Sequence, residues 1–583
     1  SLIPGDQLQL YYSFWLVRQM VHGDIPWFQN VYEFNEGDDD ARRELRHFYL
    51  PISVPCALLS FLTGPVIAWN LTGFATLLLS YVFAFYVYRS FTEDRWTAHA
   101  GALVSIAIPY RWVNFLGGSP AGFAMLWPAA MAWAVDRTVR RHSCYGFLAG
   151  LALLFSRFTD IHVFFFTALA TPVLFLICAV NVHGLGSDLR RMVTRTIWGV
   201  AMTASVGSLA LLYSLIRSRA VAVSNLGGIR EPAEVALLSP PVSALVHWRG
   251  SGLVSHAYVG YVMLLLFVLL FAGAVLVLFR KRERIQARLA QIVVPILFLA
   301  VLLLAIDLAL GINGVGGVRK WQWLCGLIPP YGQVRQPTKV LCLFPLLGGV
   351  AIIALQRLLA ALKSPRRFQR WIVLAISFAV IVECSLQVRA TITLLPETEP
   401  SYARVVADAQ ARGDKPQAVA VPLWPGDSAW TSIEQYATTR HPIRLLNGYQ
   451  PVVPHRYYDG VFAPLKSLNK GELTEAQDVM LGKMGVDYVI VRENAFPEKV
   501  SPFSVWHTIR AFTRSPFLEP LATDRGVWAF RRLGSEPRSE VTGEPPSASW
   551  VDADWYGFSR VYAADRCSLE EGTEDGTVQL VRE

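Results

Sequence analysis

A series of long uncharged runs between Leu50 and Thr391 limits what this chain can fold into. About ten of them approach the roughly 20 apolar residues that a helix needs to cross a bilayer. Only 17% of the residues are charged, against about a quarter in soluble domains. The sequence therefore predicts an α-helical polytopic membrane protein, with spans at residues 65–88, 97–110, 121–135, 145–159, 162–182, 196–216, 258–279, 289–312, 338–360 and 371–391.

Two further membrane segments are expected. The run at 50–64 is short and interrupted by proline, which favours an interfacial or re-entrant helix. An eleventh span is expected ahead of Ser1, because an even number of spans would otherwise leave both ends outside the cell.

Every second hydrophilic segment between the spans is basic. The five segments RSFTEDR, DRTVRRH, HGLGSDLRRMVTR, RKRERIQAR and KSPRRFQR hold 17 Lys or Arg and 5 Asp or Glu. The positive-inside rule places them in the cytoplasm, so the first 50 residues and the C-terminal region are expected on the extracytoplasmic side. These loops also account for the basic pI, which is therefore no evidence for nucleic-acid binding.

Changes in composition divide the chain into four expected regions. Residues 1–50 form a first extracytoplasmic loop, whose aromatic run YYSFWLVRQM predicts an amphipathic helix on the bilayer, and residues 51–391 form the transmembrane domain. Residues 392–533 alternate short β-rich runs with helical stretches, which predicts an extracytoplasmic α/β domain. Residues 534–583 are a Pro-rich linker and a short β-rich tail.

Polar residues interrupt the extracytoplasmic side at two places. Asp6 precedes the aromatic helix, where it is either a functional acid or the first-turn acid that stabilises a helix N-terminus. Asp160 and His162 lie in LLFSRFTDIHVFFF between two spans, where Asp160 either faces a polar cavity or pairs with Arg157 in a tight turn.

Basic residues follow on the same side. They include Arg111 in IPYRWVNFLGG, and Arg335 and Lys339 in YGQVRQPTKVLCLFPLL. Such residues either anchor the protein to lipid phosphates or, beside a carboxylate, bind a phosphate-containing substrate.

The order of these segments resembles the GT-C superfamily of integral-membrane glycosyltransferases, in an uncharacterised bacterial branch. The likeness lies in GDQLQLYYSFWLVRQMVHGDIPWFQNVYEF with its Gly23 to Pro26 turn, in GPVIAWNL, IPYRWVNFLGG and YGQVRQPTKVLCLFPLL, and in the downstream segments AVAVPLWPGDSAWTSIEQYATTRHPIRLLNGYQP and LGKMGVDYVIVREN. It covers about residues 1–535, and its motifs are diffuse.

The resemblance implies a site and a reaction. Asp6 matches the first-loop acid that acts as catalytic base, and Asp160 and His162 lie near where another loop contributes a second polar residue. Arg335, Lys339 and Arg111 would meet the donor phosphate, with Lys339 standing where the family pattern has Arg. The implied reaction is inverting transfer of a hexosyl or pentosyl group from a polyprenyl-phosphate donor to a glycan, lipid or protein acceptor, at the extracytoplasmic face of a bacterial inner membrane.

No cofactor is certain from the sequence, and an Mg or Mn ion at the acidic first loop is an open alternative. The acids concerned are Asp6, Glu33 and Asp38 to Asp40, whose spacing does not establish a metal site. The rival functions are a polytopic transporter or lipid flippase, and a non-catalytic scaffold. A transporter would place paired charges on broken helices at the bilayer midplane, whereas the charges here gather at one face.

Overall fold

Two compact units make up the protein, for which we analysed a computed structural model. The membrane unit holds the described residues of 47–218 and 228–391, and the α/β unit holds those of 1–46, 219–227 and 392–583. The structure describes residues 5–37, 48–183, 188–221, 230–249, 253–280, 289–362, 364–388, 398–426, 428–450, 452–496, 504–534, 567–571 and 578–582.

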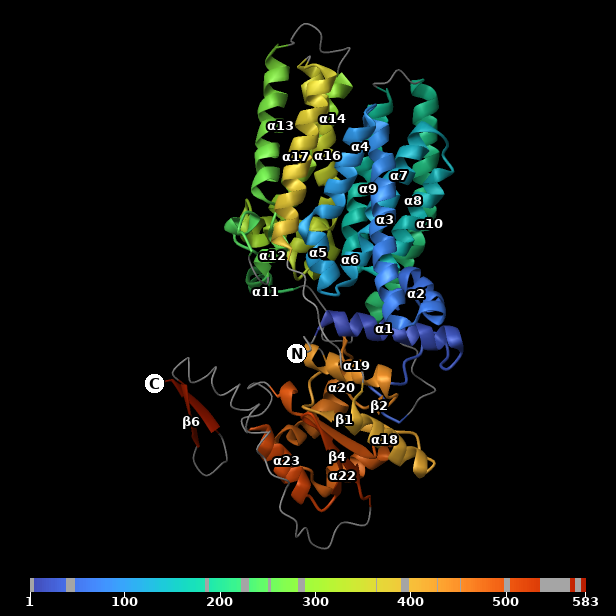
Figure 1. Cartoon of the computed structure of the whole chain (residues 1–583), viewed down its shortest axis with the longest axis vertical. Coiled ribbons are helices and arrows are strands. Elements are labelled where there is room, and N and C mark those ends of the chain that lie inside the picture. Colours follow the sequence, from blue (N-terminus) through green and yellow to red (C-terminus); the bar gives the residue numbers. More distant parts are fainter. Residues whose placement is uncertain are drawn as a thin grey trace. The chain divides into compact units, whose positions relative to one another are not determined.

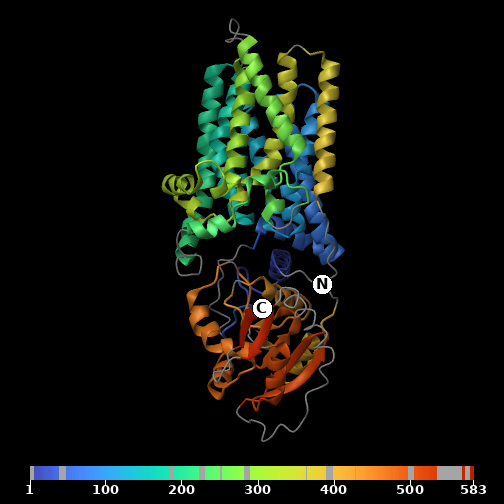
Figure 2. The ribbon, with the colours of Figure 1, turned by 90° about the vertical axis from the view of Figure 1, so that its left-hand side faces the viewer.

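The membrane unit has a helix at each of the ten predicted spans. In both views the long helices run roughly parallel to one another (Figure 1, Figure 2). They are α3 (Pro65–Phe91), α4 (Arg95–Ala107), α7 (Leu126–Arg140), α8 (Tyr145–Thr159), α9 (Ile161–His183), α10 (Leu189–Val221), α13 (Tyr261–Arg280), α14 (Leu289–Ala309), α16 (Phe344–Ala361) and α17 (Arg366–Gln387).

Six segments among the described residues are long and apolar enough to cross a membrane, which is fewer than the ten predicted spans. They are Pro65–Phe91, Ile161–Val182, Leu189–Arg219, Val254–Gly273, Pro337–Ala361 and Arg366–Gln387. The shorter helices have local causes: α4 ends just before Pro109, and α7 is preceded by a separate short helix, α6 (Pro120–Ala124). The Pro-interrupted run forms α2 (Leu50–Thr63), too short to span.

Close helix contacts and internal polar bonds hold the membrane unit together. Gly146 on α8 faces Gly199 on α10, and Thr203 Oγ1 donates to the Gly146 carbonyl at 3.0 Å. The helix α16 is almost wholly buried, and Tyr88 on α3 donates to its Leu346 carbonyl at 2.8 Å. Small residues and satisfied hydroxyl groups are what membrane helices use to approach closely.

Short elements gather at one end of the membrane unit and shape it for a site (Figure 1). They are α5 (Pro109–Leu116), α6, α11 (Pro232–Leu237), α12 (Leu253–Ala257), α15 (Gly317–Leu327) and the 3-10 segments η4 (Pro329–Gln333) and η5 (Pro337–Leu343). The segment η5 leads directly into α16 and packs against α5, α9, α12 and α14.

The α/β unit is built on a five-stranded sheet of order β2-β1-β3-β5-β4. The strands are β1 (Gln417–Val421), β2 (Arg444–Leu445), β3 (Tyr488–Arg492), β4 (Leu518–Asp524) and β5 (Val527–Arg532). The first three are parallel, and β5 runs antiparallel to β3 and β4. The alternation of short β-rich runs with helical stretches that was expected in residues 392–533 is confirmed, with β1, β2, β3 and β5 in the runs AVAVPL, IRLLNG, DYVIVR and GVWAFRRL.

Helices cover both faces of this sheet, because each strand of the centre is apolar on both sides. On one face α18 (Pro400–Ala411) and α19 (Ser432–Arg440) pack against alternate strand residues, and on the other α22 (Glu475–Lys483) and α23 (Val505–Arg514) do so. The short helices α20 (His455–Tyr457) and α21 (Ala463–Leu465) lie between β2 and α22 in sequence, and β6 (Cys567–Glu571) pairs with β7 (Val578–Arg582) as a separate hairpin.

The first loop belongs to the α/β unit rather than forming a region of its own. Its helix α1 (Asp6–His22) packs on α19, with the Tyr11 and Tyr436 rings 6.0 Å apart. Beyond α1, the backbone N–H of Asn35 donates to the Leu445 carbonyl at 2.9 Å, so the chain continues along the edge of β2. The helix expected on the bilayer is thus docked on the α/β domain.

Candidate functional site

The first group of predicted site residues lies where α8 meets α9. Asp160 separates the two helices, and its Oδ1 accepts the backbone N–H groups of His162 at 2.8 Å and Val163 at 2.9 Å. Asp160 is therefore the N-cap of α9, a position for which Asp and Asn are about equally suited. The His162 Nδ1 lies 3.8 Å from the same carboxylate oxygen.

Arg157 does not point along this turn but toward α10. Its Nε donates to Ser214 Oγ at 2.6 Å, and its guanidinium lies 4.8 Å from the centre of the Tyr213 ring. One of the two sequence-based expectations was that Arg157 and Asp160 form an ion pair in a tight turn. The contacts that orient these two side chains are instead those to α10 and to the start of α9.

Two cations belong to the chain around η5, which packs against α9, the helix that holds His162. Lys339, in η5, and Arg335, just before it, both lie within electrostatic range of the His162 imidazole. Lys339 also lies within electrostatic range of the His256 imidazole, on α12. We call Asp160, His162, His256, Arg335 and Lys339 the loop-end cluster.

The two cations differ in how far their charge is already offset. Arg335 is exposed and lies 3.9 Å from Glu234, which also pairs with Arg230 at 3.2 Å. The Lys339 ammonium has no ion pair with any residue that the structure describes, and it is only partly exposed. An unpaired, partly buried ammonium favours an anionic ligand more than a cation that already has a carboxylate partner.

Arg111 is buried rather than on an external rim. Its side chain is 1% exposed, and its Nη2 donates to the Thr76 carbonyl at 3.3 Å. Arg111 and Cys342 line the same small hollow. Its assignment to the donor phosphate remains a prediction.

Asp6 lies in the α/β unit, in the first turn of α1. Its side chain is exposed, and its Oδ1 accepts a hydrogen bond from the Tyr449 hydroxyl at 3.3 Å. No side chain caps α1, so Asp6 serves this helix through its charge in the first turn. Both the structural and the catalytic interpretation stay consistent with this position.

The predicted metal ligands of the first loop fit a metal poorly where they can be described. Glu33 is fully buried, and its carboxylate accepts hydrogen bonds from Asn30 Nδ2 at 2.8 Å, from the Tyr449 backbone at 2.9 Å and from Gln435. Asp38 to Asp40 lie outside the described residues. Within the described parts of the chain, no three His, Cys, Asp or Glu side chains form a metal-ligand group.

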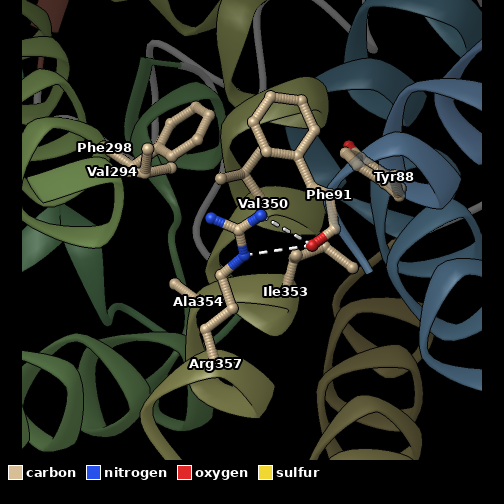
Figure 3. A pocket seen from close by; sticks show the side chains of 8 residues that line it. All are labelled: Tyr88, Phe91, Val294, Phe298, Val350, Ile353, Ala354 and Arg357. Atoms are coloured by element: carbon tan, nitrogen blue, oxygen red, sulfur yellow. Dashed lines mark hydrogen bonds between the residues drawn. The ribbon is translucent and has the colours of Figure 1, made fainter. Parts of the chain in front are cut away.

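A separate small hollow lies between α3, α14 and α16. In Figure 3 the Arg357 guanidinium points to the Phe91 carbonyl, to which it donates at 2.8 and 3.0 Å. The remaining lining is Tyr88 and aliphatic or aromatic side chains, which offer no acid or base for chemistry. We therefore assign this hollow no part in the reaction.

Two members of the site's surroundings escaped the sequence analysis. Glu234 lies in α11 and joins Arg230 to Arg335, and Tyr110 packs its ring 6.2 Å from that of His256. The prolines that bound α11 and α5 predict breaks between helices, but they do not predict which residues Glu234 and Tyr110 contact.

Comparisons with known proteins agree with this description of the fold. No protein-family model and no curated protein matches the sequence. Solved structures of the arabinofuranosyltransferase AftD from Mycobacteria are similar at 13% identity, with 91% of this chain and 40% of that chain covered and a TM-score of 0.48. Two structures of an AftD variant are also similar. One has 14% identity, with 92% of this chain and 41% of that chain covered and a TM-score of 0.49. The other has 14% identity, with 93% of this chain and 40% of that chain covered and a TM-score of 0.52.

These likenesses establish the fold and no more. The protein is an integral membrane protein with a fold similar to that of AftD and a small sheet domain near its C-terminal end. The chain spans about 40% of the length of the AftD structures that it matches.

Proposed function

We propose that this protein is a membrane glycosyltransferase of GT-C type, which transfers a sugar from a polyprenyl-phosphate donor to a hydroxyl group of a glycan, lipid or protein acceptor. The observation that carries the proposal is the loop-end cluster. Lys339 has no ion pair among the residues that the structure describes, and Lys339 and a second cation, Arg335, lie within electrostatic range of His162, where η5 packs against α9. The similarity of the fold to that of AftD supports glycosyl transfer as the reaction class.

The donor phosphate would bind at the loop-end cluster. As the bond between the anomeric carbon and the phosphate oxygen breaks, the leaving phosphate gains a negative charge. A preorganised ammonium and guanidinium stabilise such a charge best when water is partly excluded. Lys339 is the main candidate for this role, and Arg335 and Arg111 are secondary ones.

The acceptor needs a base. In the inverting mechanism the acceptor oxygen attacks the anomeric carbon from the face opposite to the phosphate, and the hydroxyl proton passes to a carboxylate. We assign this role to Asp6, which the resemblance indicates and whose carboxylate is exposed. Asp160 would hold the start of α9, and with it His162, in place.

The test is transfer of labelled sugar from a panel of polyprenyl-phosphate sugars by the purified protein in lipid. Asp6→Asn is expected to lower kcat by about 100-fold or more with donor binding retained, as loss of a general base does. Asp459→Asn, at another exposed acid of the α/β unit, is the control. Transfer at the wild-type rate by Asp6→Asn would remove Asp6 as the base.

A second variant separates the two acids. Asp160→Asn keeps the helix cap, because Asn caps a helix about as well as Asp, yet it removes the charge. If this variant loses transfer while Asp6→Asn retains it, Asp160 is the base. Substrate-dependent flux in sealed vesicles, without transfer from any donor, would instead establish the transporter and contradict the proposal.

A further inference from the structure

Two aromatic side chains project from the turn that follows α1. Trp27 is 47% exposed and Phe28 48% exposed, and their ring centroids lie 6.2 Å apart. The Gln29 backbone N–H donates to the Pro26 carbonyl at 3.3 Å, which closes a four-residue turn with Trp27 and Phe28 at its two central positions. A pair of half-exposed aromatic rings on a turn apex is an uncommon way to use apolar surface.

The turn is held in a costly conformation. Phe28 has a φ of +65°, in the left-handed region that turns of this kind normally fill with Gly or Asn. A bulky residue is disfavoured there, because its Cβ comes too close to the following carbonyl oxygen. The left-handed backbone of Phe28 sets the direction in which its ring leaves the turn.

Buried residues on either side fix the turn. Ile25 is 5% exposed on one side. On the other, Asn30 is fully buried, accepts a hydrogen bond from the Tyr12 hydroxyl at 2.8 Å and donates to Glu33 at 2.8 Å. The rings are therefore presented by a rigid support, which lowers the entropy cost of binding a ligand.

The charge of the surrounding sequence argues against a bilayer as the partner. From Gln19 to Asp40 the chain has six acidic residues and no Lys or Arg, whereas surfaces that dock on anionic lipid present Lys and Arg beside their aromatic residues. Asp24, just before the turn, is exposed and accepts a hydrogen bond from His22 through Oδ1 at 2.8 Å. Its other oxygen has no hydrogen bond to any residue that the structure describes and can accept one from a ligand hydroxyl.

We propose that Trp27, Phe28 and Asp24 form a binding site for a neutral glycan chain, the acceptor of the transfer reaction. Aromatic faces carry negative partial charge and attract the weakly positive C–H face of a sugar ring, while a carboxylate accepts its hydroxyl groups. Two adjacent rings suit two successive sugars. The acceptor assignment rests on the proposed function, whereas glycan binding itself does not.

The experiment measures binding of linear arabino-, manno-, gluco- and galacto-oligosaccharides to the full-length protein in nanodiscs, without any donor. Trp27→Ala is expected to weaken the tightest of these complexes about tenfold, the scale for loss of a central aromatic contact. Phe28→Gly should also weaken binding while leaving the thermal stability unchanged or higher, since Gly adopts the turn without strain. Tyr458→Ala, at a 46% exposed aromatic residue of the same unit, should have no effect.

Three results would overturn the inference. The first is that the wild type binds no neutral oligosaccharide, and the second is that the wild type and Trp27→Ala bind with equal affinity. The third is that brominated lipids quench the part of the fluorescence that Trp27→Ala removes, which would place Trp27 in the bilayer. Because no donor is present, glycan binding without transfer would keep the inference and remove the proposed function, and transfer without Trp27-dependent binding would do the reverse.

Discussion

The carboxylate of Glu33 accepts a hydrogen bond from the backbone N–H of Tyr449 at 2.9 Å, across 416 residues of sequence. Gln9 and Gln435 both donate to the Tyr449 carbonyl, at 3.1 and 3.0 Å. The first loop and the α/β domain thus share one buried polar network. Because buried polar groups must be satisfied, this network makes the loop a structural part of the domain.

Replacing Glu33 should therefore destabilise the α/β unit. Glu33→Ala leaves the N–H groups of Tyr449, Asn30 and Gln435 without their acceptor in a buried site, which costs about 3 kcal/mol. The measurement is the urea midpoint of the α/β unit in the full-length protein, monitored through hydrogen exchange of β2. Glu36→Gln, on the same segment but partly exposed and 4.0 Å from Arg456, is the control and should change stability by less than about 0.5 kcal/mol.

The contact between Gly146 and Gly199 leads to a second prediction. A Cβ on Gly146 would lie 2.8 Å from the Gly199 Cα. A Cβ on Gly150, one turn further on, would lie 2.6 Å from the Val206 Cβ. Gly146→Ala should force α8 away from α10 and lower the free energy of unfolding of the membrane unit by about 1 to 3 kcal/mol, measured as a fall in Tm. Gly207→Ala, whose Cβ would lie 3.6 Å from Leu153, should be tolerated, and equal losses in both variants would contradict this packing argument.

Local patterns in the sequence predicted the elements of both units well. The ten apolar runs and the alternating strands depend on residues within one helix or strand, and so they are visible without tertiary contacts. The docking of the first loop was not predictable in this way. The aromatic residues of α1 suggested a bilayer partner, yet Tyr12 bonds to Asn30 and Tyr11 packs on Tyr436, contacts that have no local period.

The candidate site was predictable as residues but not as an arrangement. Asp160, His162 and Lys339 each stood out as polar interruptions of apolar sequence. Their proximity depends on how η5 packs against the start of α9, which no spacing encodes. Arg111 shows the converse, because a charge next to a predicted loop suggested exposure while the fold buries it.

His441 predicts how the stability of the α/β unit depends on pH. Burial lowers the pKa of His441, an effect that Arg440 strengthens and the Glu399 carboxylate opposes, and its Nε2 accepts the Glu399 backbone N–H at 3.4 Å. The folded unit therefore holds the neutral imidazole. The unfolded chain takes up a proton near pH 6.5, so this contribution to stability is complete above that pH and is lost as the pH falls below it.

His441→Gln removes the titration while keeping a hydrogen-bond acceptor. The urea midpoint of the α/β unit should fall less between pH 7.5 and pH 5.5 in this variant than in the wild type. His455→Gln, at an exposed histidine of the same unit, serves as the matched control and should reproduce the wild-type profile. A His441→Gln profile as steep as that of the wild type would show that other groups set the acid sensitivity.

The different surroundings of Lys339 and Arg335 predict unequal effects on donor binding. Lys339 has no carboxylate partner among the residues described, so Lys339→Met should raise the Kd for a polyprenyl phosphate about tenfold or more, the scale of a charge-assisted phosphate contact. Arg335→Gln should raise it less, because Glu234 already offsets part of the Arg335 charge. Glu234→Gln should lower the Kd by releasing Arg335. Arg319→Gln, at an exposed cation of α15, controls for nonspecific attraction to the lipid phosphate, and a loss there as large as in Lys339→Met would mean that net charge, rather than the loop-end cluster, binds the donor.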